Sequence, residues 1–508
     1  MQRDPREPSE KEVCDEDARV LGKMGYAQEL ARCIHAFSNF AISFSIICII
    51  AGGITSFHIG YSATGGFAAG VGWLAGGIFA AIVACSMAQI ASAYPTAGGL
   101  YHWSSILGGR GWGWATAWVN LTGLIFVVAS VDVGVYTLFK DLVLTNIFRV
   151  DVNQWGAWQQ VAGMLVIAAS QGVFNHFGMR LTAKLTDISG VLIFVLAIAI
   201  TFVMIFSTRE FEFHRLFTFT NLTGESGGGV FPYTGNAWLA FGLSLLLPLY
   251  TLTGFDASAH AAEETVNARS SVPRGMLNAV IWSVAFGYIM ICSFVLALPA
   301  HAARNGSNIL FDLFSSLPVV PGVKNLIYAG IVVANFFCGL AGVTSTSRMI
   351  YAFARDGGLP HRLRYVSPIY RTPTPAIWTT IALAVAATLY APAFNALAAG
   401  CAVFLYLSYI MPVAAGFFAE GKSWTEFGPF RLGIFSKPLA LAGMVGVAIL
   451  CYLGVQPPNE ILINCAAGLC LLLIFGWFFF ERRRFTGPPV ADLTGNRSSN
   501  RTHANRGN

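Results

Sequence analysis

The stretch Leu249-Tyr250-Thr251-Leu252-Thr253-Gly254-Phe255-Asp256, followed by Ala262-Glu263-Glu264-Thr265, decides the fold. It belongs to an apolar segment long enough to cross a bilayer, and a Thr-Gly pair interrupts that segment midway. A helix that loses backbone hydrogen bonds in lipid must have the freed groups satisfied by protein, water or a bound solute. The stretch therefore predicts a discontinuous membrane helix beside a solute site.

The rest of the chain is equally apolar. Of its 508 residues 55% are hydrophobic and 11% charged, and the mean hydropathy is +0.61. Soluble proteins carry about 25% charged residues, so the composition predicts an integral membrane protein. Apolar runs near the length needed to cross about 30 Å of hydrocarbon occur at 34–58, 67–92, 112–144, 158–178, 182–207, 236–262, 273–300, 323–354, 374–391, 393–419, 437–455 and 459–480. We therefore expect an all-α polytopic protein with about twelve membrane helices.

The charge distribution predicts an orientation. Placing both tails in the cytoplasm leaves all but six of the 31 Lys and Arg residues on the inner side; the exceptions are Lys140, Arg149, Arg209, Arg215, Arg304 and Lys324. This split follows the positive-inside rule and favours a multi-pass protein of a cell membrane, either a plasma membrane or a bacterial inner membrane. The basic residues lie between apolar runs rather than on one face, which argues against nucleic acid binding.

The spacing of the runs predicts two similar halves, 34–207 and 236–419, within a transport core at 34–419. A cytoplasmic tail at 1–33, two further helices at 420–481 and a second cytoplasmic tail at 482–508 complete the chain, and we expect both tails to be disordered. Each half begins with an interrupted helix, at Ala51-Gly52-Gly53 and at Thr253-Gly254. Five helices per half give the halves opposite topologies, and paired interruptions of this kind indicate an inverted-repeat transporter.

The two interruptions predict a zwitterion site. Amides around Gly52, Gly53 and Ile54 are candidates to hold a carboxylate, and carbonyls of Tyr250, Thr251 and Thr253 to accept from an ammonium. Glycine lets the backbone approach a solute because it has no Cβ. The alternative is that the glycines only permit close packing of helices.

Other polar residues in the spans are further candidates. Tyr250 lies one turn before the break, where its ring is positioned to close over a solute; the alternative is an ordinary buried tyrosine. Three interpretations of Asp256 stay open, as a proton carrier, a gating contact or a charge at a helix N-terminus. His260, one turn later, is interpreted either as a proton relay or as a hydrogen-bonded structural residue. Three remaining residues pair with a substrate or line its pocket, or bond to neighbouring helices: Asp132, Thr122 and Asn335.

Charges at the inner ends of two spans suggest a gate. Glu263 and Glu264 end the sixth span, and Arg348, Arg355 and Asp356 end the eighth, at the same predicted depth. Exchange of salt bridges among them would open and close an inner gate. Solvated helix ends give the same pattern.

Three segments resemble a known family: Gly254-Phe255-Asp256-Ala257-Ser258-Ala259-His260-Ala261-Ala262-Glu263-Glu264-Thr265 with Val272-Pro273-Arg274-Gly275, then Ser92-Ala93-Tyr94-Pro95-Thr96-Ala97-Gly98-Gly99-Leu100-Tyr101, and the segment from Ser347-Arg348 to Leu359-Pro360. They are similar to segments of the amino acid-polyamine-organocation (APC) permeases. The likeness is strongest to the amino acid and choline branch, which includes 4-aminobutyrate permeases. The resemblance implies a five-plus-five inverted repeat with two more helices, and secondary uptake of amino acids or related amines by alternating access.

The sequence departs from that family's pattern at the first break, where Ala51-Gly52-Gly53-Ile54 replaces Gly-Ser-Gly or Gly-Thr-Gly before Ile. Leu252 replaces a second aromatic. A lysine inside the fifth span, found in some proton-coupled relatives, is absent, so the coupling ion, H⁺ or Na⁺, stays open.

Several functions remain as alternatives. The first is a transporter of choline, another organic cation or a polyamine, and the second is a nutrient sensor that does not transport. An intramembrane enzyme is disfavoured, because the sequence holds no His-Glu-x-x-His and no Gly-x-Ser-x-Gly at a helix start. The ten cysteines lack metal-ligand spacing, and we expect neither a metal nor a cofactor. The oligomeric state is open.

Overall fold

The computed structural model describes residues 10–152, 154–208, 210–224, 230–299, 309–390 and 394–489. Two residues predicted to face outward, Arg209 and Arg304, lie outside these ranges, as do the two chain ends. The described chain is almost entirely helical, with two isolated β-bridges and no strand. The prediction of an all-α polytopic protein is confirmed.

Nine helical segments in the described ranges are long and apolar enough to cross a membrane. They contain α2 (Ala36–Ile47) with α3 (Ile49–Thr55), α5 (Trp73–Ala93), α7 (Arg110–Leu138) with η2 (Phe139–Leu144), α9 (Met179–Ser207), α13 (Ala268–Ala297), α15 (Pro321–Arg355), α17 (Phe394–Ala419), α18 (Ser436–Gly454), and α19 (Ile461–Phe475) with η9 (Gly476–Glu481) and α20 (Arg482–Arg484). The three other predicted spans coincide with α8 (Ala157–His176), with α10 (Ala237–Ser244), α11 (Leu246–Thr251) and α12 (Ala257–His260), and with α16 (Thr374–Tyr390).

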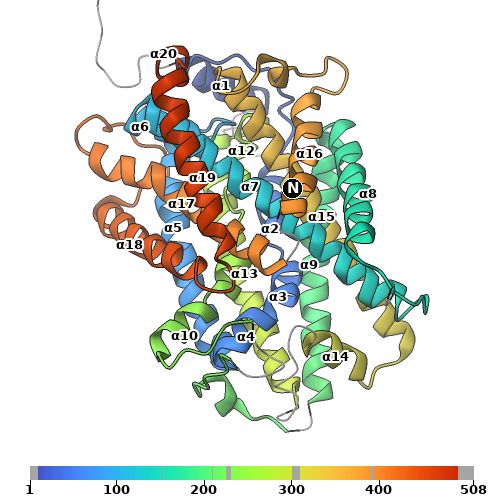
Figure 1. Ribbon diagram of the computed structural model, residues 1–508. Coiled ribbons are helices and arrows are strands. Elements are labelled where there is room, and N and C mark those ends of the chain that lie inside the picture. The colour runs from blue at the N-terminus through green and yellow to red at the C-terminus, as the bar shows by residue number, and fades with distance from the viewer. Residues whose placement is uncertain are drawn as a thin grey trace, which may run out of the picture.

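Shorter elements join these spans. They are α1 (Glu10–Lys23), α4 (Phe57–Thr64), α6 (Leu100–Gly108), α14 (Ile309–Ser316), the π-helix η1 (Ala68–Gly72), and the 3₁₀ turns η3 (Phe213–Leu216), η4 (Ala262–Glu264), η7 (His361–Arg364) and η8 (Gly433–Phe435). The described tails, α1 and α20, lie at the same end of the bundle, which we call the tail end (Figure 1).

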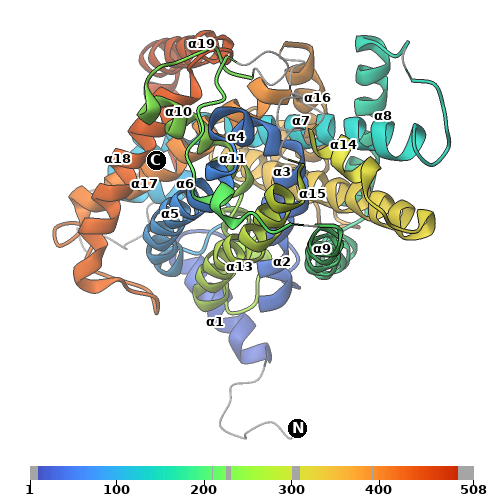
Figure 2. The ribbon, with the colours of Figure 1, turned by 90° about the horizontal axis from the view of Figure 1, so that it is seen from below.

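Burial separates core helices from peripheral ones. The apolar windows of the α2–α3 span and of α17 are each 94% buried, whereas those of the α18 and α19 spans are 28% and 6% buried. Seen along the bundle, α3 and α11 lie near its centre and α19 at its margin (Figure 2). The broken helices therefore sit where the other helices enclose them.

The first span breaks at a different residue from the one predicted. Cys48 adopts a left-handed conformation (φ 31°, ψ 81°) and separates α2 from α3, whereas Ala51-Gly52-Gly53-Ile54 lies within α3. Cys48 is held there because its amide donates to Phe44 O at 3.0 Å and its Sγ accepts from the Ala51 amide at 3.4 Å. Left-handed backbone is uncommon for a residue with a Cβ. No sequence rule would have picked this cysteine.

The break in the sixth span lies where it was predicted. Helix α11 ends at Thr251, α12 begins at Ala257, and Gly254 between them has a φ of +88°. A Cβ on Gly254 would overlap the Ile46 side chain, so this position requires glycine both for its backbone and for its packing.

The N-terminal tail also differs from expectation, since residues 10–23 form helix α1. The last turn of α1 and the loop that follows are packed on the tail end, with Leu21, Met24 and Leu30 buried. Asp17 accepts hydrogen bonds from the amides of Asn267 and Ala268 at the start of α13, at 2.7 and 3.2 Å. The prediction of disorder was wrong for these residues because scattered apolar side chains in a polar segment found a binding surface on the bundle. Residues 482–489 are likewise ordered, with Phe485 buried.

Candidate functional site

The two broken spans are bonded to each other. Ser43 of α2 donates to Phe255 O at 2.8 Å and accepts from the Ser258 amide at 2.9 Å. Asn39, one turn earlier, donates to Ser258 O at 3.0 Å. These bonds satisfy backbone groups that the break at 252–256 leaves without helical partners, as a non-aqueous environment requires.

Glycine makes a second close contact between the spans. A Cβ on Gly52 would lie 2.7 Å from Thr251 Cγ2, and one on Gly53 would lie 3.1 Å from Met290 Cε. The Gly52 amide donates to Cys48 O at 3.0 Å within the helix. Gly52 is therefore a packing residue here, and its amide is not free for a carboxylate. The amides of Ile49 and Ile50, which begin α3, are the ones without a helical partner.

The backbone of the sixth-span break is only partly satisfied. Leu252 O accepts from the Tyr406 hydroxyl at 3.3 Å, and the Gly254 amide donates to Tyr409 Oη at 2.9 Å. Tyr250 O accepts from the Thr253 hydroxyl at 2.8 Å. Within the described ranges, the carbonyl oxygens of Thr251 and Thr253 accept no hydrogen bond. Two acceptors thus remain at the break, both on residues that the sequence predicted.

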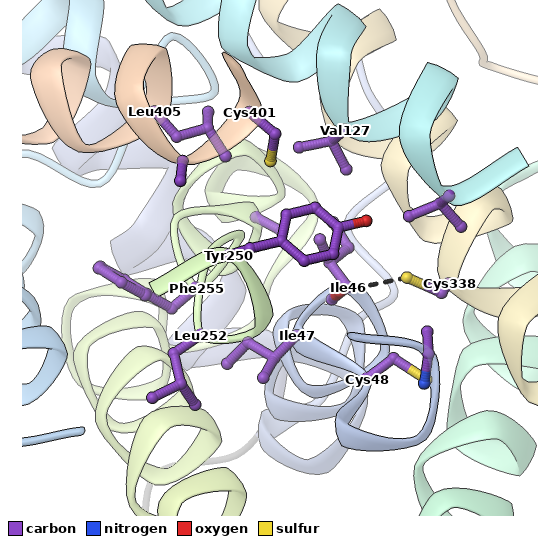
Figure 3. Packing of buried hydrophobic residues seen from close by; sticks show 14 of the residues in the cluster. Ile46, Ile47, Cys48, Val127, Tyr250, Leu252, Phe255, Cys338, Cys401 and Leu405 are labelled. Atoms are coloured by element: carbon purple, nitrogen blue, oxygen red, sulfur yellow. Dashed lines mark hydrogen bonds between the residues drawn. The ribbon is translucent and has the colours of Figure 1, made fainter. Parts of the chain in front are cut away.

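Tyr250 lies beside this break with its ring among apolar side chains and sulfur atoms (Figure 3). Its hydroxyl donates to Ser130 Oγ at 3.1 Å, and its ring stands edge-on to Phe394 with 5.7 Å between centroids. Only 7% of its surface is exposed. The ring therefore lies next to the break rather than out in solvent.

Asp256 is fully buried and is bound from three helices. Its Oδ1 accepts from the Tyr409 hydroxyl of α17 at 2.7 Å, and its Oδ2 accepts from Asn120 Nδ2 of α7 at 3.4 Å. His260 Nε2 lies 3.2 Å from the same Oδ2.

The imidazole of His260 lies between two acceptors. Its Nδ1 lies 3.3 Å from the carbonyl oxygen of Ala97, and its Nε2 lies 3.2 Å from Asp256 Oδ2. A neutral imidazole carries hydrogen on one nitrogen and donates to one of these two oxygens. The tautomer of His260 therefore decides which of the two contacts is a hydrogen bond.

Two ion pairs lie at the tail end of the sixth and eighth spans. Arg348 donates to Glu264 through Nε at 3.0 Å and through Nη2 at 3.3 Å, and both side chains are buried. Arg355 makes a similar pair with Glu263, at 3.0 and 2.9 Å. Burial raises the pKa of the Glu263 carboxyl, but Arg355 outweighs this and the pKa ends below its usual value. Four residues predicted to lie at one depth thus form two bidentate pairs.

Asp356, the fifth predicted residue of this group, binds other partners. Its Oδ2 accepts from Tyr26 at 2.8 Å and lies 2.9 Å from His102 Nε2, and Tyr101 donates to it as well. Burial raises its pKa, yet hydrogen bonding and charge from His102 bring it below the ordinary value. The Arg355 guanidinium lies 3.9 Å above the Tyr26 ring. The N-terminal loop therefore contacts the same tail-end charges through Tyr26.

Thr122, Asn335 and Asp132 lie elsewhere. Thr122 donates to Trp118 O and Asn335 to Ile331 O, both within their own helices at 2.8 Å. Asp132 accepts from Gln171 Nε2 at 2.8 Å. In the described structure no hydrogen bond joins these three to the broken helices. Asn120, Tyr406 and Tyr409, which do bind the sixth-span break, were missed because a polar or aromatic residue in an apolar run carries no sign of which helix it faces.

A helical membrane bundle with two discontinuous helices that meet at its centre defines a class, the transporters built around broken spans. The chain belongs to the amino acid permease family of the APC superfamily: the profile of the family described as amino acid permease matches residues 34–490. It is 32% identical to amino-acid permease BAT1 of Arabidopsis thaliana, over 94% of this chain and 97% of the relative. A rice homologue of BAT1 (Oryza sativa subsp. japonica) is also 32% identical, over 94% and 96%. An uncharacterized amino-acid permease of Schizosaccharomyces pombe is 28% identical, over 96% and 90%.

Proposed function

We propose that this permease is a secondary active transporter that moves a small amino acid or an amino-bearing metabolite across the membrane by alternating access. The observation that carries the proposal is the pair of unfilled carbonyl acceptors, Thr251 O and Thr253 O, at a break enclosed by the bundle. Carbonyls at a helix end carry partial negative charge and suit an ammonium group. The amides of Ile49 and Ile50 lie on the other broken span and would face the carboxylate.

The substrate we propose first is 4-aminobutyrate or a similar small amino acid, because the sequence resembles the branch that includes 4-aminobutyrate permeases. The alternative is choline, another organic cation or a polyamine. These solutes lack a carboxylate and would leave the amides of the first span without an anionic partner. A sensor that binds but does not transport would show ligand binding without flux.

The direct test is uptake into proteoliposomes that contain the purified full-length chain. Labelled 4-aminobutyrate, a mixture of labelled amino acids, choline and a polyamine are offered separately, with empty liposomes as control. Accumulation of an amino acid supports the proposal, and accumulation of choline or polyamine alone supports the alternative. Ligand-induced thermal stabilisation without any flux would favour the sensor.

The tail-end ion pairs support an inner gate. We propose that the tail end faces the cytoplasm of a plasma or bacterial inner membrane, as the charge distribution predicts. In the arrangement described here the pairs Glu264–Arg348 and Glu263–Arg355 are formed, which is the closed state of that gate. Opening toward the cytoplasm requires both pairs to separate while the repeats 34–207 and 236–419 rearrange. The helices at 420–481 lie outside this core.

We further propose that Asp256 and His260 are linked to the transport cycle. Asp256 begins the second half of the sixth span and contacts α7 and α17, so a change in its protonation alters how the broken span is held. Uptake that ignores an imposed pH gradient but follows a Na⁺ gradient would assign the coupling ion to Na⁺ and remove this role.

A further inference from the structure

Asp132 is a buried carboxyl group that the site described above does not use. It lies within α7 and has no exposed surface. Its Oδ1 accepts from Gln171 Nε2 of α8 at 2.8 Å, but its Oδ2 has no partner among the described residues. A buried carboxylate with half of its acceptors empty is unfavourable, and such groups in membrane helices are functional by default.

Gln171, the hydrogen-bond partner of Asp132, also has an acceptor that is unpaired among the described residues. Gln171 Nε2 is shared between Asp132 Oδ1 and Phe336 O, while Gln171 Oε1 has no partner in the described structure. Asp132 Oδ2 and Gln171 Oε1 are thus two acceptors without a donor in the described structure. A proton on the carboxyl turns the unpaired Oδ2 into a donor.

The surroundings offer no countercharge. The residue facing Asp132 from α8 is the neutral Gln171, and the titratable group facing it from α15 is the thiol Cys338. Within the described ranges, none of the ion pairs includes Asp132. Protonation is therefore the neutralising event that this environment permits.

Packing argues against a metal cation in this place. A Cβ on Gly339 of α15 would lie 2.6 Å from Asp132 Oδ1 and would overlap Gln171 Nε2. Hard cations bind through a shell of several oxygens. Helices α7, α8 and α15 leave no space beside Oδ1 for a methyl group, and so none for such a shell.

Two residues near Asp132 contact the broken spans. Ser130, two residues before Asp132, accepts the hydroxyl of Tyr250 from the sixth span at 3.1 Å. Cys338, which faces Asp132, donates to Ile46 O at 3.2 Å in the last turn of α2, the bond drawn in Figure 3. Through Cys338, a change in the charge of Asp132 acts on the end of the first broken helix.

We infer that Asp132, with Gln171 as its hydrogen-bond partner, is a proton-binding site that couples this transporter to a proton gradient. The inference rests on the proposed transport function. During a cycle Oδ2 gains a proton from water on one side of the membrane, forming one O–H bond, and releases it to water on the other side. Substrate and proton then travel together, because the bond from Cys338 to the first broken span depends on the charge of Asp132.

The test uses the full-length chain and two variants. Asp132→Asn places an amide where the protonated acid would be, so it keeps the volume and fixes the neutral state. Asp141→Asn is the matched control, since Asp141 lies at the end of the same membrane segment and is paired with Lys140 at 3.4 Å. Infrared spectroscopy of the purified proteins near neutral pH reads the carbonyl band of a protonated carboxylic acid directly, without any substrate.

In the infrared measurement we expect a carboxylic acid band in the wild type and in Asp141→Asn that is missing from Asp132→Asn. In proteoliposomes offered a labelled amino acid mixture that includes 4-aminobutyrate, we expect an inward proton gradient to speed wild-type uptake by about tenfold. Asp132→Asn should lose this acceleration while its exchange of internal for external substrate without a gradient is kept.

Three results would overturn the inference. They are a wild-type spectrum identical to that of Asp132→Asn, wild-type uptake that does not respond to the proton gradient, and an Asp132→Asn protein whose response equals that of the wild type. A wild type that takes up no amino acid refutes the proposed function and the coupling with it. The infrared band would still show whether Asp132 holds a proton, so the two failures are distinguishable.

Discussion

Replacing Glu264 by Gln should open the tail end of the protein. The change removes one partner of a buried bidentate ion pair and leaves the Arg348 guanidinium, whose side chain is 1% exposed, without a countercharge. Breaking such a pair costs about 3–5 kcal/mol, because the remaining charge is both buried and unpaired. If this cost falls on the closed state alone, the ratio of closed to open falls by about two to three and a half powers of ten, since about 1.4 kcal/mol is a factor of ten.

A native cysteine reports on this opening. The amide of Cys33 donates to Glu264 O at 2.9 Å, so the thiol lies beside the gate. Burial, and then the charge of Glu264, raise the pKa of this thiol to about 11, which keeps it unreactive at neutral pH. Opening exposes the thiol and removal of the charge lowers its pKa, so both effects speed alkylation.

The assay is alkylation by a maleimide, followed at Cys33 by peptide mass spectrometry. We expect Cys33 in Glu264→Gln to react at least about tenfold faster than in the wild type. This factor is smaller than the full change in the ratio of closed to open, because the Glu263–Arg355 pair still holds the same end. Adding Arg348→Met to Glu264→Gln removes the orphan charge and should restore part of the protection. Glu16→Gln is the control, since its pair with Arg19 is exposed.

Two results together would show that the Glu264–Arg348 pair does not hold the tail end closed. They are equal alkylation rates at Cys33 in the wild type and in Glu264→Gln, and unchanged melting temperatures. Transport that is unaffected in the double variant would remove the gate role even if the pair stabilises the fold. A faster rate in Glu16→Gln would show that the reporter responds to unspecific loosening.

Three further outcomes are expected. Gly52→Ala should lower stability by about 1–3 kcal/mol, because the added Cβ has no space beside Thr251. Gly468→Ala should leave stability unchanged, because no atom lies within 4 Å of a Cβ at that position, and thermal melts of both proteins test the difference. Tyr409→Phe should lower stability by about 1–3 kcal/mol and weaken ligand-induced thermal stabilisation, since it removes a donor to a buried carboxyl and an acceptor of a backbone amide. A ligand-induced rise in melting temperature equal to that of the wild type would contradict this. The folded-state pKa values of the Glu263 and Asp356 carboxyls lie below their ordinary values of 4.5 and 3.8. The stability that these ionised carboxyls contribute is therefore full above their ordinary pKa values and is lost as the pH falls through their lower folded-state pKa values. Melting temperatures recorded across acid pH should fall less steeply in Glu263→Gln than in the wild type.

The sequence alone determined the class of fold and the location of one break. Membrane-length apolar runs are set by the thickness of the bilayer, so composition and spacing reveal them without knowledge of contacts. The Thr253-Gly254 interruption was readable because glycine is required where the backbone turns left-handed. The grouping of Glu263, Glu264, Arg348 and Arg355 was readable because charges at span ends share a depth.

The tertiary structure decided what faces what. Gly52 looks like a helix break but packs against Thr251. The first span breaks instead at Cys48, which the end of α2 and the start of α3 hold left-handed through hydrogen bonds to its amide and its sulfur. Asn120 and Tyr409 were invisible as partners of Asp256, since hydropathy does not encode the rotation of a fully buried helix. Composition predicts that residues 10–33 are disordered, and only the tertiary structure shows that their few apolar side chains have a surface on the bundle to pack against.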